Sequence, residues 1–191
     1  MEKKQQLFER MFKRLKDDLP SFMVYHDLKH TKQVIDNSIF LGKMEGCTDY
    51  ELDVLSIAAL YHDSGFLLGS ESHEMKGCFL IKADLPSYGF SSHEIEQICG
   101  MIMATKTPQS PHNKLEQILA DADLFYLGTD QYVNQSMLLK NELIHFNPSL
   151  KDEEWKEIQV DFLETHVYHT DYGKTVLSPI KQKNLDKILR S

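Results

Sequence analysis

Apolar side chains recur at steps of three and four residues along most of the chain, and this is the spacing of one face of an α-helix. One such stripe runs through the first residues and closes at Pro20, and a second begins at His30 and ends near Gly46. The strict alternation that marks a β-strand is hard to find. The pattern therefore predicts an all-α protein, built as a single compact bundle of about seven to nine helices.

Three segments carry the signature of a helix start, in which a capping residue is followed three positions later by a glutamate. The pairs are Thr48 with Glu51, Ser91 with Glu94, and Asn113 with Glu116. Each pair precedes an apolar stripe, so a helix is expected to begin there. Further helices are expected over residues 72–83, 131–143, 152–165 and 171–189, the last of them disturbed by Pro179.

The composition is that of a globular chain with a sizeable core. Of the 191 residues, 41% are hydrophobic and 26% are charged, which predicts a single domain over residues 1–191. The net charge of −8 offers no basic footprint for nucleic acid, so nucleic acid is not expected as a partner. The chain lacks a long apolar run and the apolar core of a signal peptide, and this predicts a cytoplasmic protein without a membrane partner.

Polar side chains interrupt two of the apolar stripes. His62 continues the stripe of Leu55 and Ala59, and Asp123 continues the stripe of Leu119. A buried carboxylate is costly unless it is paired or bound to a metal. Further imidazole and carboxylate groups stand nearby in the pattern. The possible metal donors then come from three segments: His30, the pair His62-Asp63, and Asp121-Ala122-Asp123. Two imidazoles and two carboxylates are typical of a divalent-metal site that keeps positions open for water and substrate.

The motifs that carry these residues resemble those of the HD superfamily of metal-dependent phosphohydrolases. The matching stretches are Tyr-His-x-x-x-His-Thr at residues 25–31, His-Asp-x-Gly at 62–65, and Asp-Ala-Asp-Leu with a following Leu-Gly at 121–128. The resemblance covers roughly residues 20–130, and residues 131–191 are expected as helices that pack on this motif core. It implies a helical bundle of the HD-domain type.

The resemblance also implies which residues hold the metal. The implied ligands are His30, His62, Asp63 and Asp123. Asp121 is the alternative fourth ligand. In that superfamily a divalent ion polarises a phosphoryl oxygen and activates a water for attack on phosphorus.

Two residues are implied as catalytic. Asp63 would orient the attacking water as well as bind the metal. His26 lies one helical turn before His30 and would protonate the leaving oxygen. A supporting role beside the metal ligands is the alternative for His26.

One metal ion is expected rather than two. Binuclear members of the superfamily carry further histidines between the second and third motifs, and His73, in the context His-x-x-x-Gly, matches the first of them. The next one usually ends an Ile-x-x-His step, but Thr105 stands at that place, and His112 is the candidate substitute. Manganese, iron, cobalt, nickel, magnesium and zinc all remain open, because mixed imidazole and carboxylate ligation selects weakly among them.

Other residues would have to bind the substrate. Glu74, Lys76 and Lys106 lie near the expected site in sequence, and either lysine could contact phosphate, with a solvated surface position as the alternative. The aromatic-rich segment at residues 166–174 is interpreted as a connection that packs on the bundle, with a specificity segment across the cleft as the alternative. Trp155 and the Phe162-Leu163 pair are expected to be packing residues.

The leading hypothesis is a metal-dependent phosphoric ester hydrolase. Its expected partner is a small phosphorylated substrate, such as a nucleotide or another phosphomonoester or phosphodiester. A di-iron oxygenase on the same scaffold is one alternative, although Thr105 removes one of the ligands that two irons need. A non-catalytic metal- or nucleotide-binding sensor module is the other. The sequence leaves open the physiological substrate, the native metal and the oligomeric state.

Overall fold

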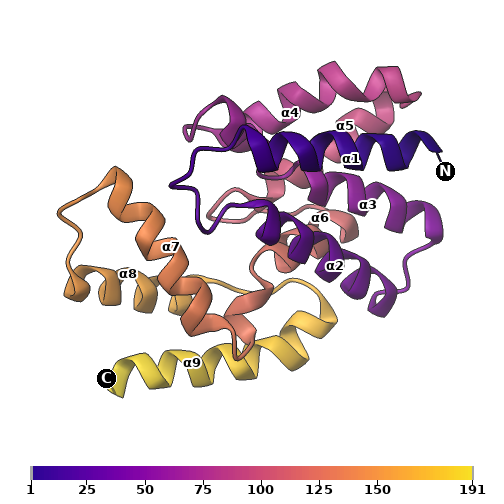
Figure 1. Cartoon of the computed structure of the whole chain (residues 1–191). Helices are drawn as coiled ribbons and strands as arrows, with labels where there is room; N and C mark the ends of the chain where they lie inside the picture. Colours follow the sequence, from indigo (N-terminus) through magenta and orange to yellow (C-terminus); the bar gives the residue numbers. More distant parts are fainter. Residues whose placement is uncertain (1, 191) are drawn as a thin grey trace.

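The computed structural model describes residues 2–190, and in this range the chain is helical without β-strands (Figure 1). Within the same range, no helix is both long and apolar enough to cross a membrane. The prediction of an all-α bundle is confirmed. The α-helices of this range are α1 (Glu2–Asp17), α2 (Leu28–Met44), α3 (Asp49–Tyr61), α4 (His73–Asp84), α5 (Ser92–Thr105), α6 (Lys114–Asp123), α7 (Tyr132–Phe146), α8 (Asp152–Thr165) and α9 (Ser178–Arg190).

Short helical turns connect several of these helices. The helix expected over residues 171–189 is present without a break, and it contains a π-helical turn directly before α9. Single 3-10 turns follow α3, α4 and α6. The turns are η1 (Ser64–Leu68), η2 (Leu85–Tyr88), η3 (Phe125–Gly128) and the π-helical η4 (Gly173–Leu177).

The helix-start signals read from the sequence are present. Thr48 and Ser91 each accept a hydrogen bond from the backbone N–H three positions on, and the glutamate there accepts from the N–H of the cap, so both capping boxes form. Asn113 caps α6 with its side chain in the same way. Asp27 caps α2 by accepting from the N–H of His30 at 2.8 Å. This cap fixes the turn that carries His30.

The chain packs around two apolar cores. The first joins α1 to α6, and Leu55 and Ile98 are fully buried in it. The second lies among η3 and the C-terminal helices, where Leu163 and Leu185 are buried. In Figure 1, α7, α8 and α9 accordingly lie to one side of the group formed by α1 to α6. The single domain expected over residues 1–191 stays a prediction, and within the described range it would contain two centres of packing.

Asp121 ties the C-terminal segment to α6. Its buried carboxylate accepts hydrogen bonds from the backbone N–H groups of His169 and Thr170, at 2.9 and 2.8 Å, and from the Thr170 hydroxyl at 2.7 Å. Gly173 packs so closely against this group that a Cβ would lie 2.4 Å from Asp121 Oδ2. The segment at residues 166–174 is therefore anchored on the bundle through Asp121.

Candidate metal centre and adjoining cavity

The two histidines of the motif meet inside the first packing unit. His30 lies in the first turn of α2, and His62 directly follows α3. His62 is completely buried, and its Nδ1 donates to the carbonyl oxygen of Ala59 at 2.7 Å. This bond leaves Nε2 of His62 free to approach Nε2 of His30, at 3.3 Å. Two imidazole nitrogens thus face one point from two helices.

Two carboxylates complete the cluster. Asp123 Oδ1, at the end of α6, lies 3.1 Å from His30 Nε2 and 3.5 Å from His62 Nε2. Asp63 Oδ2 lies 3.0 Å from His62 Nε2 and 3.4 Å from His30 Nε2. The structure therefore brings together the four residues expected as ligands. Asp121, the alternative, is engaged by the C-terminal segment instead.

The donor set fits a divalent cation. Asp63 Oδ2 is buried and accepts no hydrogen bond from the described residues, which is a costly state for a carboxylate oxygen unless a cation lies beside it. His30, His62 and Asp123 offer ligand atoms that all lie within 4.8 Å of one another. Imidazole and carboxylate ligands together suit several divalent ions, so the chemistry supports a metal without selecting one.

The same proximity shifts the acid–base properties of the cluster. Burial alone would lower the pKa of His30, but its hydrogen bond to Asp123 and the negative charge of Asp63 outweigh burial and raise this pKa to about 9. Burial likewise opposes a charge on His62, yet the carboxylate of Asp63 raises the His62 pKa well above its usual value. Burial would raise the pKa of Asp123, but the two imidazoles hold it well below its usual range. A bound cation would therefore have to replace imidazole protons.

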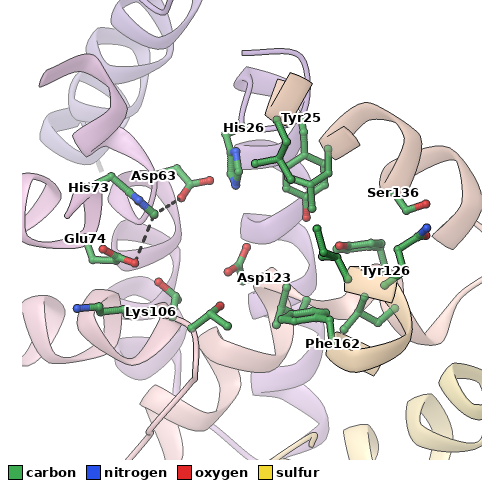
Figure 2. Close-up of a pocket in the computed structure, with 18 of the residues that line it drawn as sticks. Tyr25, His26, Asp63, His73, Glu74, Lys106, Asp123, Tyr126, Ser136 and Phe162 are labelled. Atoms are coloured by element: carbon green, nitrogen blue, oxygen red, sulfur yellow. Dashed lines mark ion pairs between the residues drawn. The ribbon is translucent and has the colours of Figure 1, made fainter. Parts of the chain in front are cut away.

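Gly65 allows α4 to approach the His-Asp pair. A Cβ at this position of η1 would lie 1.8 Å from the backbone carbonyl oxygen of His73, so a larger residue would displace the start of α4. The close approach places His73 Nε2 3.4 Å from Asp63 Oδ1 and 3.6 Å from Glu74 Oε1 (Figure 2). Asp63 consequently faces His73 with one oxygen and the two motif histidines with the other.

The other sequence candidates are placed differently. Lys106, which is exposed, and Thr105 both belong to the lining of the cavity that Asp63 also lines. Lys76 is half-buried and His112 is exposed, and neither belongs to the cavity lining among the described residues. The structure therefore groups His73, Glu74 and Lys106 with the centre and leaves Lys76 and His112 outside it.

His26 is held by a residue that sequence reasoning missed. Glu142 on α7 is buried, and its Oε1 lies 2.5 Å from Nδ1 of His26. Its Oε2 accepts from the backbone N–H groups of Tyr25 and His26, at 3.0 and 3.1 Å. Because Nδ1 is engaged, Nε2 of His26 is the nitrogen left for a substrate. The available signal was the spacing of Glu142 from Leu138 and Leu139, which places a carboxylate on an apolar helix face, as for Asp123.

A cavity of about 410 Å³ extends from this centre to α7 and α8. In Figure 2, Asp63, His73 and Glu74 lie on one side of it, and Tyr126, Ser136 and Phe162 lie on the other. Phe162 packs against the second core and Leu163 is buried in it, as expected, but Trp155 and Phe162 also line the cavity. The sequence could not distinguish the two roles, because an apolar residue facing a cavity has the same helical spacing as one facing a core.

Comparison with solved structures shows an HD-like fold. A predicted HD superfamily hydrolase from an uncultured Thermotogales bacterium matches with a TM-score of 0.65 and 20% identity, covering 97% of this chain and 89% of its own. YpgQ of Bacillus subtilis, whose structure is a complex with ADP, matches with a TM-score of 0.66 and 14% identity, covering 98% and 94%. A Lactobacillus plantarum protein matches with a TM-score of 0.66 and 14% identity, covering 97% and 96%.

The sequence comparisons add no closer assignment. No protein-family model matches the chain, and a search of curated proteins found no significant match. The structural likeness therefore shows an HD-like fold, and the His and Asp cluster lies within it.

Proposed function

We propose that this protein is a metal-dependent phosphohydrolase that acts on a nucleotide or another small phosphomonoester or phosphodiester. The observation that carries the proposal is the cluster of His30, His62, Asp63 and Asp123, whose Asp63 Oδ2 is buried without a hydrogen bond at the wall of a ligand-sized cavity. One divalent ion held by these four residues is the proposed occupancy. The ADP bound in the YpgQ structure supports a nucleotide as the substrate.

The ion would supply a Lewis acid for the phosphoryl oxygen and lower the pKa of a water. Asp63 would orient the attacking water with the oxygen that faces His73. His26, with Nδ1 fixed by Glu142, would donate a proton from Nε2 to the leaving oxygen. Lys106, a cation at the cavity wall, would contact a phosphoryl oxygen.

The test is hydrolysis of a panel of nucleotides and phosphoesters by the purified protein loaded in turn with each candidate metal. Activity is expected, and His62→Ala and Asp123→Asn should each abolish it together with the bound metal measured by mass spectrometry. His93→Ala is the matched control, because His93 is exposed on α5, and it should keep both activity and metal. Circular dichroism verifies that each variant is folded.

The two alternative functions would give different results. A di-iron oxygenase would consume oxygen only when loaded with iron, and the place of His73 beside Asp63 is the observation that favours a second ion. A sensor module would bind metal and nucleotide without releasing phosphate from any compound. Either result, obtained with a fully metal-loaded preparation, would contradict the proposed phosphohydrolase.

A further inference from the structure

The cavity wall on α7 and α8 includes large apolar side chains that belong to neither packed core. Trp155 is 95% buried, with 5% of its surface exposed, yet it lies outside both apolar cores of the described chain. Leu139 and Leu143 are half-buried and also lie outside both cores. All three line the cavity that contains Asp63 and Asp123. Large apolar side chains that face an open cavity instead of a core mark a surface shaped for a ligand.

Flat and polar groups interrupt this apolar wall at a few points. The rings of Tyr126 and Tyr132, which both line the cavity, are parallel within 6°. The Tyr132 hydroxyl donates to Gln159 Oε1 at 2.8 Å, which fixes the Gln159 amide on α8. The indole N–H of Trp155 is buried and has no hydrogen-bond partner among the described residues. A buried donor without an acceptor destabilises a fold. We therefore expect a ligand to supply the acceptor for this N–H.

We propose that the α7–α8 wall holds the organic part of the substrate, and that this part is a flat, mostly apolar ring system with a hydrogen-bond acceptor for the indole N–H of Trp155. The inference rests on the proposed phosphohydrolase function for the phosphoryl end of the same cavity. Nucleobases and simple aryl groups share the flat ring. A nucleobase also presents ring nitrogens or carbonyl oxygens as acceptors, whereas a plain aryl group does not.

The chain contains its own reporter for this pocket, because Trp155 is its only tryptophan. Fluorescence excited at the indole is measured while adenosine, benzyl alcohol, ribose or glycerol is added to the full-length protein. These probes carry no phosphate, so turnover and metal content do not affect the result. Adenosine should give a saturable change, benzyl alcohol a weaker one, and ribose and glycerol none. Equal responses to adenosine and ribose, or no response to any ring compound, would overturn the proposal.

Two neighbouring positions on α7 provide a matched pair of variants. Leu139 lines the cavity, whereas Met137 is exposed and lies outside its lining. Leu139→Phe should fill the pocket and weaken adenosine binding at least tenfold, and Met137→Phe should leave it unchanged. Trp155→Phe keeps a ring but removes the N–H, so adenosine binding measured by equilibrium dialysis should weaken about three- to tenfold. Unchanged binding in both Leu139→Phe and Trp155→Phe would exclude this wall as the binding surface.

Different results would contradict the proposed ring pocket and the proposed phosphohydrolase function. Fluorescence changes that persist in a protein without hydrolytic activity would support the pocket and contradict the function. Hydrolysis that depends on His62 but is equally efficient with phenyl phosphate, adenosine monophosphate and glycerol 3-phosphate would support the function and contradict the pocket.

Discussion

Glu142 Oε1 lies 2.5 Å from His26 Nδ1, although 116 positions of sequence separate the two residues. The same carboxylate accepts from two backbone N–H groups of the segment that carries His26. Burial would raise the pKa of Glu142, but the bonds from His26 hold it below its usual value, so the group is an anion in the fold. α7 therefore fixes both the backbone and the ring tautomer of His26.

Glu142→Gln should lower kcat about 10- to 100-fold with little change in KM, because the neutral amide cannot stabilise a protonated His26 ring. The measurement is steady-state kinetics, from which kcat and KM are determined separately. Glu142→Asp should restore part of the lost rate, and the exposed Glu153→Gln is the control. A variant with altered stability but unchanged kcat would show that Glu142 has a structural role only.

Substitutions of Asp121 and of Asp123 should have different effects on metal binding and stability. Asp123→Asn should lose the bound metal and remain folded, because it removes a ligand charge. Asp121→Ala should keep the metal but lose about 3 kcal/mol of unfolding free energy, since it leaves the N–H groups of His169 and Thr170 without their acceptor. Metal analysis and urea unfolding of both variants provide the comparison. Metal loss in folded Asp121→Ala would return Asp121 to the ligand set.

Metal affinity should rise with pH. The pKa of His30 is raised to about 9, so in the metal-free protein this ring keeps its proton through neutral pH and must release it to bind a metal. Each released proton should strengthen binding by about tenfold per pH unit below that pKa. Calorimetric titrations at pH 7, 8 and 9, in buffers of different ionisation enthalpy, count the protons. An affinity that does not change over this range would contradict the proton displacement.

His166 should make the fold sensitive to acid. Burial, reinforced by the charge of Lys181, lowers the His166 pKa to about 3, whereas the unfolded chain binds this proton near pH 6.5. The neutral ring therefore contributes stability above pH 6.5, and this contribution declines as pH falls towards 3, at up to about 1.4 kcal/mol per pH unit. Urea unfolding between pH 7 and 4 should show a shallower decline for His166→Phe than for the wild-type protein. His93→Phe, at an exposed position, controls for loss of a histidine, and parallel curves for all three proteins would refute the assignment.

Local sequence signals were sufficient to predict most of the fold and part of the candidate site. The caps at Thr48, Ser91 and Asn113 predicted helix starts because each depends on residues within one turn. His62 and Asp123 were found because a polar residue on an apolar stripe is visible in the sequence. The expected ligand set has the geometry of one site, although its metal and activity stay predictions.

Long-range relationships could not be predicted in this way. Glu142 meets His26 only because α7 folds back over the loop before α2, and no short pattern records that return. Trp155 has the helical spacing of a core residue, and its place at a cavity depends on how far α7 and α8 stand apart. Side chains that meet across unrelated helices therefore needed the structure.

The two apolar cores lie beside different parts of the proposed site. The four clustered donors lie on α2, α6 and the end of α3, at the first core, whereas the proposed ring-binding wall lies on α7 and α8, on the side of the second. If both proposals hold, changes in the C-terminal third that spare Glu142 can alter which molecules are accepted without altering the chemistry performed on them. Such a chain can diversify by drift in one region while the other is held constant, and a directed-evolution library would be placed on α7 and α8.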